Sequence, residues 1–179
     1  MNYENYPSHC SFPDSDCENF QNNHIPTWNV ALKHLKGQSN TVGIVSGYFN
    51  PIHYGHIEYI NNAKENCDWL VAIVNSDYQR ELKGSKEFMD ENHRVNIVKN
   101  LKSVDETFIS IDKDKTQCES LKYFRKKYPD KKLTFFNSGD RQGSNLVAPE
   151  SLTCKEYNIE ECVLPLPKIF SSSDLLKKL

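Results

Sequence analysis

Two histidines between residues 46 and 56 have the type and spacing of groups that act together on one bound anion. His53 and His56 are three positions apart, so both face one ligand if a helix begins here. Gly47 permits a tight turn, and Gly55 permits close approach of the backbone to a ligand. The amino end of a helix offers free amide groups and a positive dipole end, which favour phosphate. The segment therefore predicts a phosphate site with two imidazoles.

The same pair has simpler explanations, because two histidines at a helix start can be satisfied surface groups or metal ligands. The six cysteines are scattered and none forms a C-x-x-C pair, so a zinc site is not expected. We interpret them as reduced thiols and assign no protein metal site. The choice between these readings depends on the residues around the histidines.

Apolar runs and helical spacings alternate from Thr41 onward. The runs predicted as strands lie at 42–45, 69–74, 107–111, 133–137 and 161–164. The segments predicted as helices lie at 55–66, 93–101, 118–128, 151–157 and 173–179. This order predicts an α/β fold with a Rossmann-like, doubly wound parallel five-stranded sheet and helices on both faces. Ligands bind at the carboxyl ends of such strands, so the loop with the histidines is expected in the site.

Residues 1–40 differ from the rest of the chain. Residues 1–23 are rich in Asn, Ser, Asp and Tyr without a clear period, and 28–35 has the spacing of one short helix. We therefore predict an N-terminal extension over 1–40, partly disordered, and a folded domain over 41–179. One alternative is that this short helix packs on the domain. The other is that it buries a dimer contact or covers the site.

Charge and hydropathy exclude several classes of protein. The formal net charge is −2, so bulk electrostatics do not favour nucleic acid. No apolar run approaches the roughly 18 residues of a membrane span, and the first residues lack the order of a signal peptide. A cytoplasmic protein is expected.

The ten residues 47–56 read G-Y-F-N-P-I-H-Y-G-H and resemble the G-x-F-D-P-x-H-x-G-H signature of the cytidylyltransferase-like nucleotidyltransferases. That superfamily includes cytidylyltransferases for glycerol, choline and ethanolamine phosphates and adenylyltransferases for heptose phosphate, pantetheine phosphate and nicotinamide mononucleotide. Further matches are K-G at 83–84, H-R-V-N-I-V at 93–98, V-D-E at 104–106, N-S-G-D-R at 137–141 and I-F-S-S-S at 169–173. The resemblance covers about 41–179, which makes that part the expected nucleotidyltransferase domain.

Three departures from the family pattern stand out. Asn50 replaces an Asp found in many relatives, and Ser138 replaces a Gly. The R-T-E-G prefix of glycerol-phosphate cytidylyltransferases is absent before Ser171, which weakens assignment to that branch.

The resemblance implies a role for each matched residue. The expected catalytic residues are His53, His56 and Lys83. The expected nucleotide-binding residues are Gly47, Tyr48, Phe49, Asn50, Gly55, Gly139, Asp140, Ser171, Ser172 and Ser173. The candidates for phosphate or acceptor binding are Lys64, Lys86, Arg94 and Arg141. Mg²⁺ is expected to accompany the nucleotide phosphates with few protein ligands.

The implied reaction transfers a nucleoside monophosphate from a nucleoside triphosphate to a small phosphorylated acceptor and releases pyrophosphate. CMP is slightly favoured over AMP, and the acceptor is a polyol, amino-alcohol or sugar phosphate. The alternatives are adenylyl transfer from ATP to a sugar phosphate and a non-catalytic nucleotide-binding module, for which Asn50 argues. A homodimer is expected by analogy alone.

Overall fold

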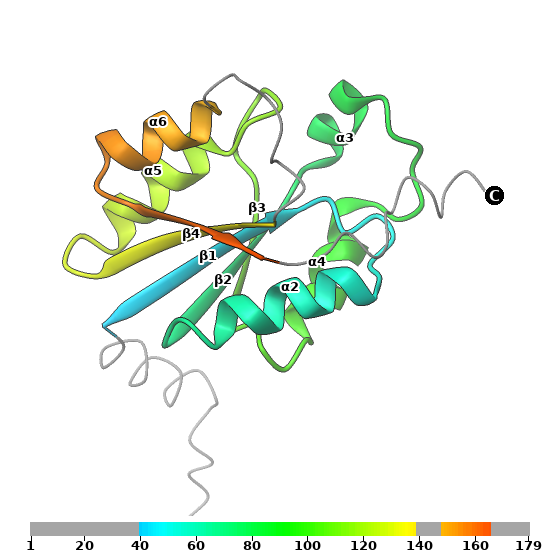
Figure 1. Cartoon of the computed structure of the whole chain (residues 1–179). Helices are drawn as coiled ribbons and strands as arrows, with labels where there is room; N and C mark the ends of the chain where they lie inside the picture. The colour runs from blue at the N-terminus through cyan, green and yellow to red at the C-terminus, as the bar shows by residue number, and fades with distance from the viewer. Residues whose placement is uncertain (1–39, 139–147, 166–179) are drawn as a thin grey trace, which may run out of the picture. The chain divides into compact units, whose positions relative to one another are not determined.

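The computed structural model describes residues 40–138 and 148–165. In these ranges five strands form one parallel sheet in the order β3-β2-β1-β4-β5 (Figure 1). The strands are β1 (Thr41–Gly47), β2 (Trp69–Val74), β3 (Glu106–Ile109), β4 (Lys132–Ser138) and β5 (Glu160–Leu164). The chain first builds β2 and β3 on one side of the central strand β1, and then returns to add β4 and β5 on the other side. The strand order therefore reverses at β1. In open sheets this switch point is where ligands bind.

Helices cover both faces of the sheet. The described helices are α2 (Tyr54–Lys64), α3 (Asp77–Lys83), α4 (Glu91–Lys99), α5 (Cys118–Lys127) and α6 (Pro149–Glu156). Figure 1 shows α2 and α4 on one face and α5 and α6 on the other. The predicted α/β fold, with its five parallel strands and helices on both faces, is confirmed.

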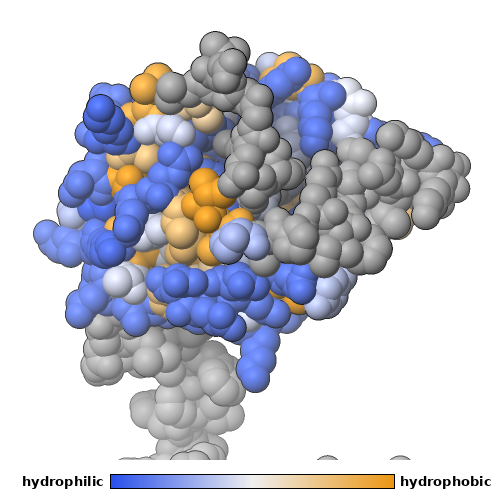
Figure 2. Space-filling view, in the orientation of Figure 1, coloured by the Kyte–Doolittle hydropathy of each residue, from blue (hydrophilic) through white to orange (hydrophobic). Residues whose placement is uncertain are grey.

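Alternate residues of β2 divide between two apolar cores. Trp69, Val71 and Ile73 pack with the cluster that contains Leu121 and Phe124 of α5. Leu70, Ala72 and Val74 pack with the cluster of α2 and α4, whose members include Tyr59, Ile60, Ala63 and Val98. All six β2 side chains are buried, because a parallel strand covered on both faces has no solvent side. On the face seen in Figure 2 hydrophilic side chains predominate, as expected outside such cores.

The sequence pattern did not predict the helix α3. Its seven residues, D-Y-Q-R-E-L-K, are too few to show an apolar stripe. Ser76 and Gln79 form a reciprocal capping box at its start, and Gly84 ends it with a φ of 70°. The pattern S-x-x-Q was the available signal for this helix.

Several predictions concern parts of the chain outside the described residues. These are the helices expected at 28–35 and 173–179 and the division between 1–40 and 41–179, which stay predictions. Among the described helices, none is long and apolar enough to cross a membrane.

Candidate active site

The loop after β1 places the paired histidines at the carboxyl edge of the sheet. Phe49 turns the chain with a φ of 50°, and its ring is 1% exposed. A Cβ on Gly47 would lie 2.9 Å from this ring, closer than carbon atoms normally approach. Gly47 is therefore needed to make room for Phe49, and its own φ is not positive. The expected glycine is in place, but the physical reason is packing.

His53 and His56 stack on each other at the start of α2. His53 is the N-cap residue, and the ring centroids are 3.9 Å apart with 26° between the planes. A Cβ on Gly55 would lie 3.3 Å from the His53 ring, so glycine leaves room for this stack. The first turn of α2 contains no acidic residue that would offset its positive dipole end. The structure therefore brings both imidazoles to a helix end suited to an anion.

His56 is held in the neutral form in the ligand-free protein. Burial lowers the pKa of His56 to about 3, helped by the nearby charges of His53 and Lys83. Burial also lowers the pKa of His53. The Nδ1 atom of His56 accepts a hydrogen bond from the backbone N–H of His53 at 3.3 Å. A neutral His56 with this acceptor carries its proton on Nε2, so Nε2–H is the group that can donate to a ligand.

The pKa of His56 leads to a prediction for stability at mildly acidic pH. The folded pKa of about 3 lies below the ordinary value of 6.5, so the unfolded chain binds more protons between these values. The contribution of neutral His56 to the free energy of unfolding is therefore complete above pH 6.5 and is lost as the pH falls toward 3. Between pH 7 and 5 the loss is expected to be on the order of 1–2 kcal/mol. Urea unfolding of wild type and His56→Asn at both pH values measures it.

Asparagine is the matched replacement, because its Oδ1 can accept the same backbone hydrogen bond without titrating. The fall in the free energy of unfolding between pH 7 and 5 should be smaller in His56→Asn. Equal falls in the two proteins would contradict the neutral burial of His56. Carboxyl groups contribute little to the comparison, because they titrate mainly below this range.

Lys83 lies in the last turn of α3, close to the histidines. Its Nζ is 4.3 Å from the centroid of the Tyr48 ring, a cation–π contact. Tyr48 is itself fixed by a hydrogen bond from its hydroxyl to the Gln79 carbonyl at 3.3 Å. The charge of Lys83 contributes to the lowered pKa of His56. The structure thus places the predicted residues Tyr48, His56 and Lys83 together.

Asn50 was expected to bind the nucleotide, but its side chain contacts the protein backbone. It is 2% exposed and bonds to the loop at residues 86–89. Lys86 is on this loop and is exposed. The candidate site therefore has Lys86 on a loop that is tied to the histidine segment.

Arg94 was predicted to bind phosphate or acceptor, and the geometry does not support this role. Its side chain is 0% exposed, and Nη2 pairs with Asp77 Oδ1 at 2.6 Å. Nη1 donates to the carbonyls of Tyr48 and Asn75, each at 2.7 Å, and Nε donates to Met89 O at 3.1 Å. Arg94 therefore holds the loops of the site together from inside the protein.

Lys64 was also predicted to contact phosphate or acceptor, but it lies at the wrong end of α2. Its Nζ pairs with Asp105 Oδ2 at 2.6 Å and donates to the Asp68 carbonyl at 2.7 Å. Asp68 immediately precedes β2, at the amino edge of the sheet, whereas His53 and His56 lie at the carboxyl edge. The helix of eleven residues separates these ends by about 15 Å.

The remaining predicted residues lie outside the described part of the chain. They are Gly139, Asp140, Arg141, Ser171, Ser172 and Ser173. In contrast, three residues that were not predicted hold residues of the site: Asn75, Asp77 and Gln79. Asn75 and Asp77 bond to Arg94, and the Gln79 carbonyl accepts from the Tyr48 hydroxyl. Asn75 Nδ2 donates to Gln79 Oε1 at 3.0 Å, and Gln79 Nε2 donates to the carbonyls of Asp114 and Thr116. The capping pattern at 76–79 was the signal that could have found Gln79.

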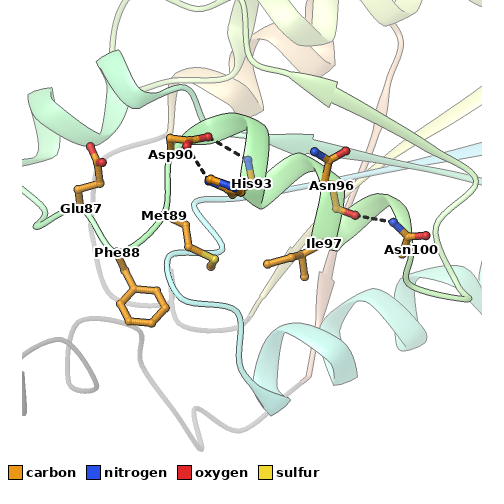
Figure 3. A pocket seen from close by; sticks show the side chains of 8 residues that line it. All are labelled: Glu87, Phe88, Met89, Asp90, His93, Asn96, Ile97 and Asn100. Atoms are coloured by element: carbon orange, nitrogen blue, oxygen red, sulfur yellow. Dashed lines mark hydrogen bonds and ion pairs between the residues drawn. The ribbon is translucent and has the colours of Figure 1, made fainter.

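A separate surface recess of about 810 Å³ adjoins α4 (Figure 3). Asp90 pairs with His93 across 2.6 Å, and Phe88 and Ile97 expose apolar surface. Among the described residues, none of those predicted for the site lines this recess. Its lining includes Phe88 and Met89 of the loop that bonds to Asn50.

The fold and the residues of the site define a class of enzyme, the nucleotidyltransferases. The model of the Cytidylyltransferase-like family matches residues 44–173, most of the chain. The chain belongs to this family.

Curated relatives include the FAD synthase of Thermoplasma acidophilum, 35% identical over 71 residues, which are 40% of this chain and 50% of the relative. The Bifunctional protein HldE of Blochmanniella floridana is 27% identical over 143 residues, 79% of this chain and 28% of the relative. The chain thus spans half of the first protein and about a quarter of the second. The crystal structure of the lipopolysaccharide core biosynthesis protein from Thermoplasma volcanium GSS1 has a TM-score of 0.56 at 22% identity. It covers 72% of this chain and 98% of its own, and it supports the fold alone.

Proposed function

We propose that the chain transfers the adenylyl group of ATP to a small phosphorylated acceptor and releases pyrophosphate. The sequence slightly favoured CMP, whereas the relatives named FAD synthase shift the preference, because FAD contains an adenylyl group joined through phosphate. Transfer of CMP to a polyol, amino-alcohol or sugar phosphate is the alternative. The argument for a non-catalytic module is weaker, because the backbone contacts of Asn50 account for a residue without charge.

The observation that carries this proposal is the His53–His56 stack at the amino end of α2 with Lys83 beside it. An oxygen of the acceptor phosphate attacks the α-phosphorus in line and forms the new P–O bond. The bond from the α-phosphorus to its bridging oxygen breaks, and pyrophosphate leaves with that electron pair. No strong base is needed, because the attacking phosphate is already anionic at neutral pH.

The histidine site contributes positioning and charge stabilisation. Nε2–H of His56 and the amide groups at the start of α2 are proposed to donate to α- and β-phosphate oxygens as charge develops. Lys83 and Lys86 add positive charge, and Gly139 and Asp140 are proposed to lie near the base and ribose. Ser171, Ser172 and Ser173 are proposed to bind the β- and γ-phosphates, and Arg141 the phosphates or the acceptor.

Mg²⁺ is proposed to arrive bound to the nucleotide. Among the described residues, no group of three or more His, Cys, Asp or Glu side chains could hold a metal ion. Imidazole and ammonium groups suit phosphate oxygens, whereas Mg²⁺ prefers oxygen ligands, which phosphates and water supply. A homodimer is proposed by analogy with relatives.

The proposal predicts a selective melting-temperature shift with ATP. ATP with magnesium, at about 100 times its dissociation constant, should add about 2.7 kcal/mol to the free energy of unfolding. CTP, GTP and UTP should give smaller shifts, and ATP should then support pyrophosphate release with a phosphorylated acceptor. Thermal unfolding with each nucleotide makes the comparison.

Two lysine variants provide the control. Lys83→Met should reduce the shift with ATP, whereas Lys64→Met, at the other edge of the sheet, should retain it. A melting-temperature shift with CTP alone would contradict the proposed adenylyl transfer and support cytidylyl transfer. The absence of a shift with all four nucleotides would contradict nucleotide binding by the free enzyme.

A further inference from the structure

The carboxamide of Asn50 uses both of its ends on one loop. Nδ2 donates to the Lys86 carbonyl at 2.8 Å, and Oδ1 accepts from the N–H groups of Phe88 and Met89 at 3.0 and 3.1 Å. Asn50 lies three residues before His53 and is 2% exposed. At this burial water cannot readily replace the lost partners, so the three bonds tie the histidine segment to residues 86–89.

Arginines from α3 and α4 hold the same loop. Arg80 donates to the Ser85 carbonyl at 3.1 Å and pairs with Glu87 at 2.7 Å. Arg94 donates to the Met89 carbonyl at 3.1 Å. Figure 3 shows residues 87–90 leading into α4. The loop that begins after Lys83 and carries Lys86 is therefore fixed before any ligand binds, and Asn50 fixes its middle.

We propose that Asn50 is a positioning residue, which holds residues 86–89 so that Lys86 and the paired histidines act on the same triphosphate. This inference rests on the proposed nucleotidyl transfer. The amide is chemically suited to the place, because it donates at one end and accepts at the other. An ionised aspartate can only accept, and it would set an anionic oxygen against the Lys86 carbonyl. The replacement of the Asp of many relatives by Asn50 is thereby explained for this chain.

The first test measures the loop directly and does not depend on activity. Asn50→Ala should accelerate hydrogen exchange of the Phe88 and Met89 amides by at least about tenfold. Asn66→Ala is the matched control, because its Nδ2 also donates to a carbonyl, that of Asn62 at 2.8 Å, but at the far end of α2. The control should leave exchange at Phe88 and Met89 unchanged. Unchanged protection of these amides in Asn50→Ala would overturn the inference.

The second test asks whether the loop acts through Lys86. Asn50→Ala should raise KM for the triphosphate about tenfold, with kcat within about twofold of wild type. In a Lys86→Ala background the same change should cost less than about threefold, because coupled residues are not additive. Additive effects, or an unchanged KM in Lys86→Ala, would overturn the role of Lys86.

A further variant keeps the test decisive if Asn50→Ala does not fold. Asn50→Asp retains the acceptor for Phe88 and Met89, replaces the donor to the Lys86 carbonyl by an anionic oxygen, and should also raise KM. A normal KM in Asn50→Asp would overturn the need for the amide. Wild-type protein without transferase activity would overturn the proposed function, whereas the exchange rates decide separately whether Asn50 holds the loop.

Discussion

Replacing His56 with alanine is expected to reduce kcat by about a hundredfold or more while the protein stays folded. His56 lies at the start of α2, stacked on His53, and with Nδ1 accepting a hydrogen bond its neutral imidazole carries the proton on Nε2. A preorganised donor directed at developing charge contributes most in the transition state. The loss should therefore fall on kcat and kcat/KM rather than on nucleotide affinity alone. Steady-state pyrophosphate release, once the nucleotide and acceptor are found, measures it.

A third histidine supplies the control for this experiment. His93 lies on α4, its side chain is 72% exposed, and it pairs with Asp90, the N-cap residue of that helix. His93→Ala should keep kcat within about twofold of wild type, as expected for a surface substitution. His53→Ala should resemble His56→Ala. Near-normal turnover in His56→Ala would contradict its role in the transition state, provided that circular dichroism shows native structure.

Replacing Arg94 with methionine is expected to destabilise the protein by about 3–5 kcal/mol. Its guanidinium pairs with Asp77 and donates to the carbonyls of Tyr48, Asn75 and Met89, with none of the side chain exposed. Methionine fills a similar volume but leaves these acceptors buried without their donor. The cost arises from the uncompensated groups that remain. Urea denaturation monitored by circular dichroism measures the change.

Arg125 is a suitable comparison. Its guanidinium also donates to backbone carbonyls, including those of Pro129 and Lys131, but the residue is only half-buried. Arg125→Met should cost less, about 1 kcal/mol. Equal stability of the two variants would contradict the view that the buried Arg94 stabilises the fold by joining the loops of the site. Because Arg94 holds Tyr48 and Met89, a destabilised variant that still folds should also bind nucleotide more weakly.

The sequence by itself determined the elements that local pattern encodes. The apolar run at 69–74 became β2 with the same bounds, because a buried parallel strand needs apolar side chains on both faces. The alternation of strands with helical spacings was enough to predict the parallel sheet. The short helix α3 escaped this reasoning, because seven residues carry little periodicity.

For the site, the order of residues between Gly47 and His56 was informative, because a strand, a loop and a helix start follow one another along the chain. The histidine pair needs only this local geometry, and the structure places it at the carboxyl edge of the sheet. The reasons for the glycines were not visible, since the Phe49 ring beside Gly47 is placed by tertiary packing.

Only the tertiary structure decided what the charged and polar side chains do. Lys64 and Arg94 have the types expected of phosphate ligands, but each is occupied by an acidic residue distant in sequence, Asp105 and Asp77. Asn50 likewise meets a loop more than thirty residues away, at Lys86. Local spacing shows which face of an element a residue occupies. It does not show which end of the sheet that face adjoins or which side chain or backbone group the residue contacts there, because residues distant in sequence come together only when the chain folds.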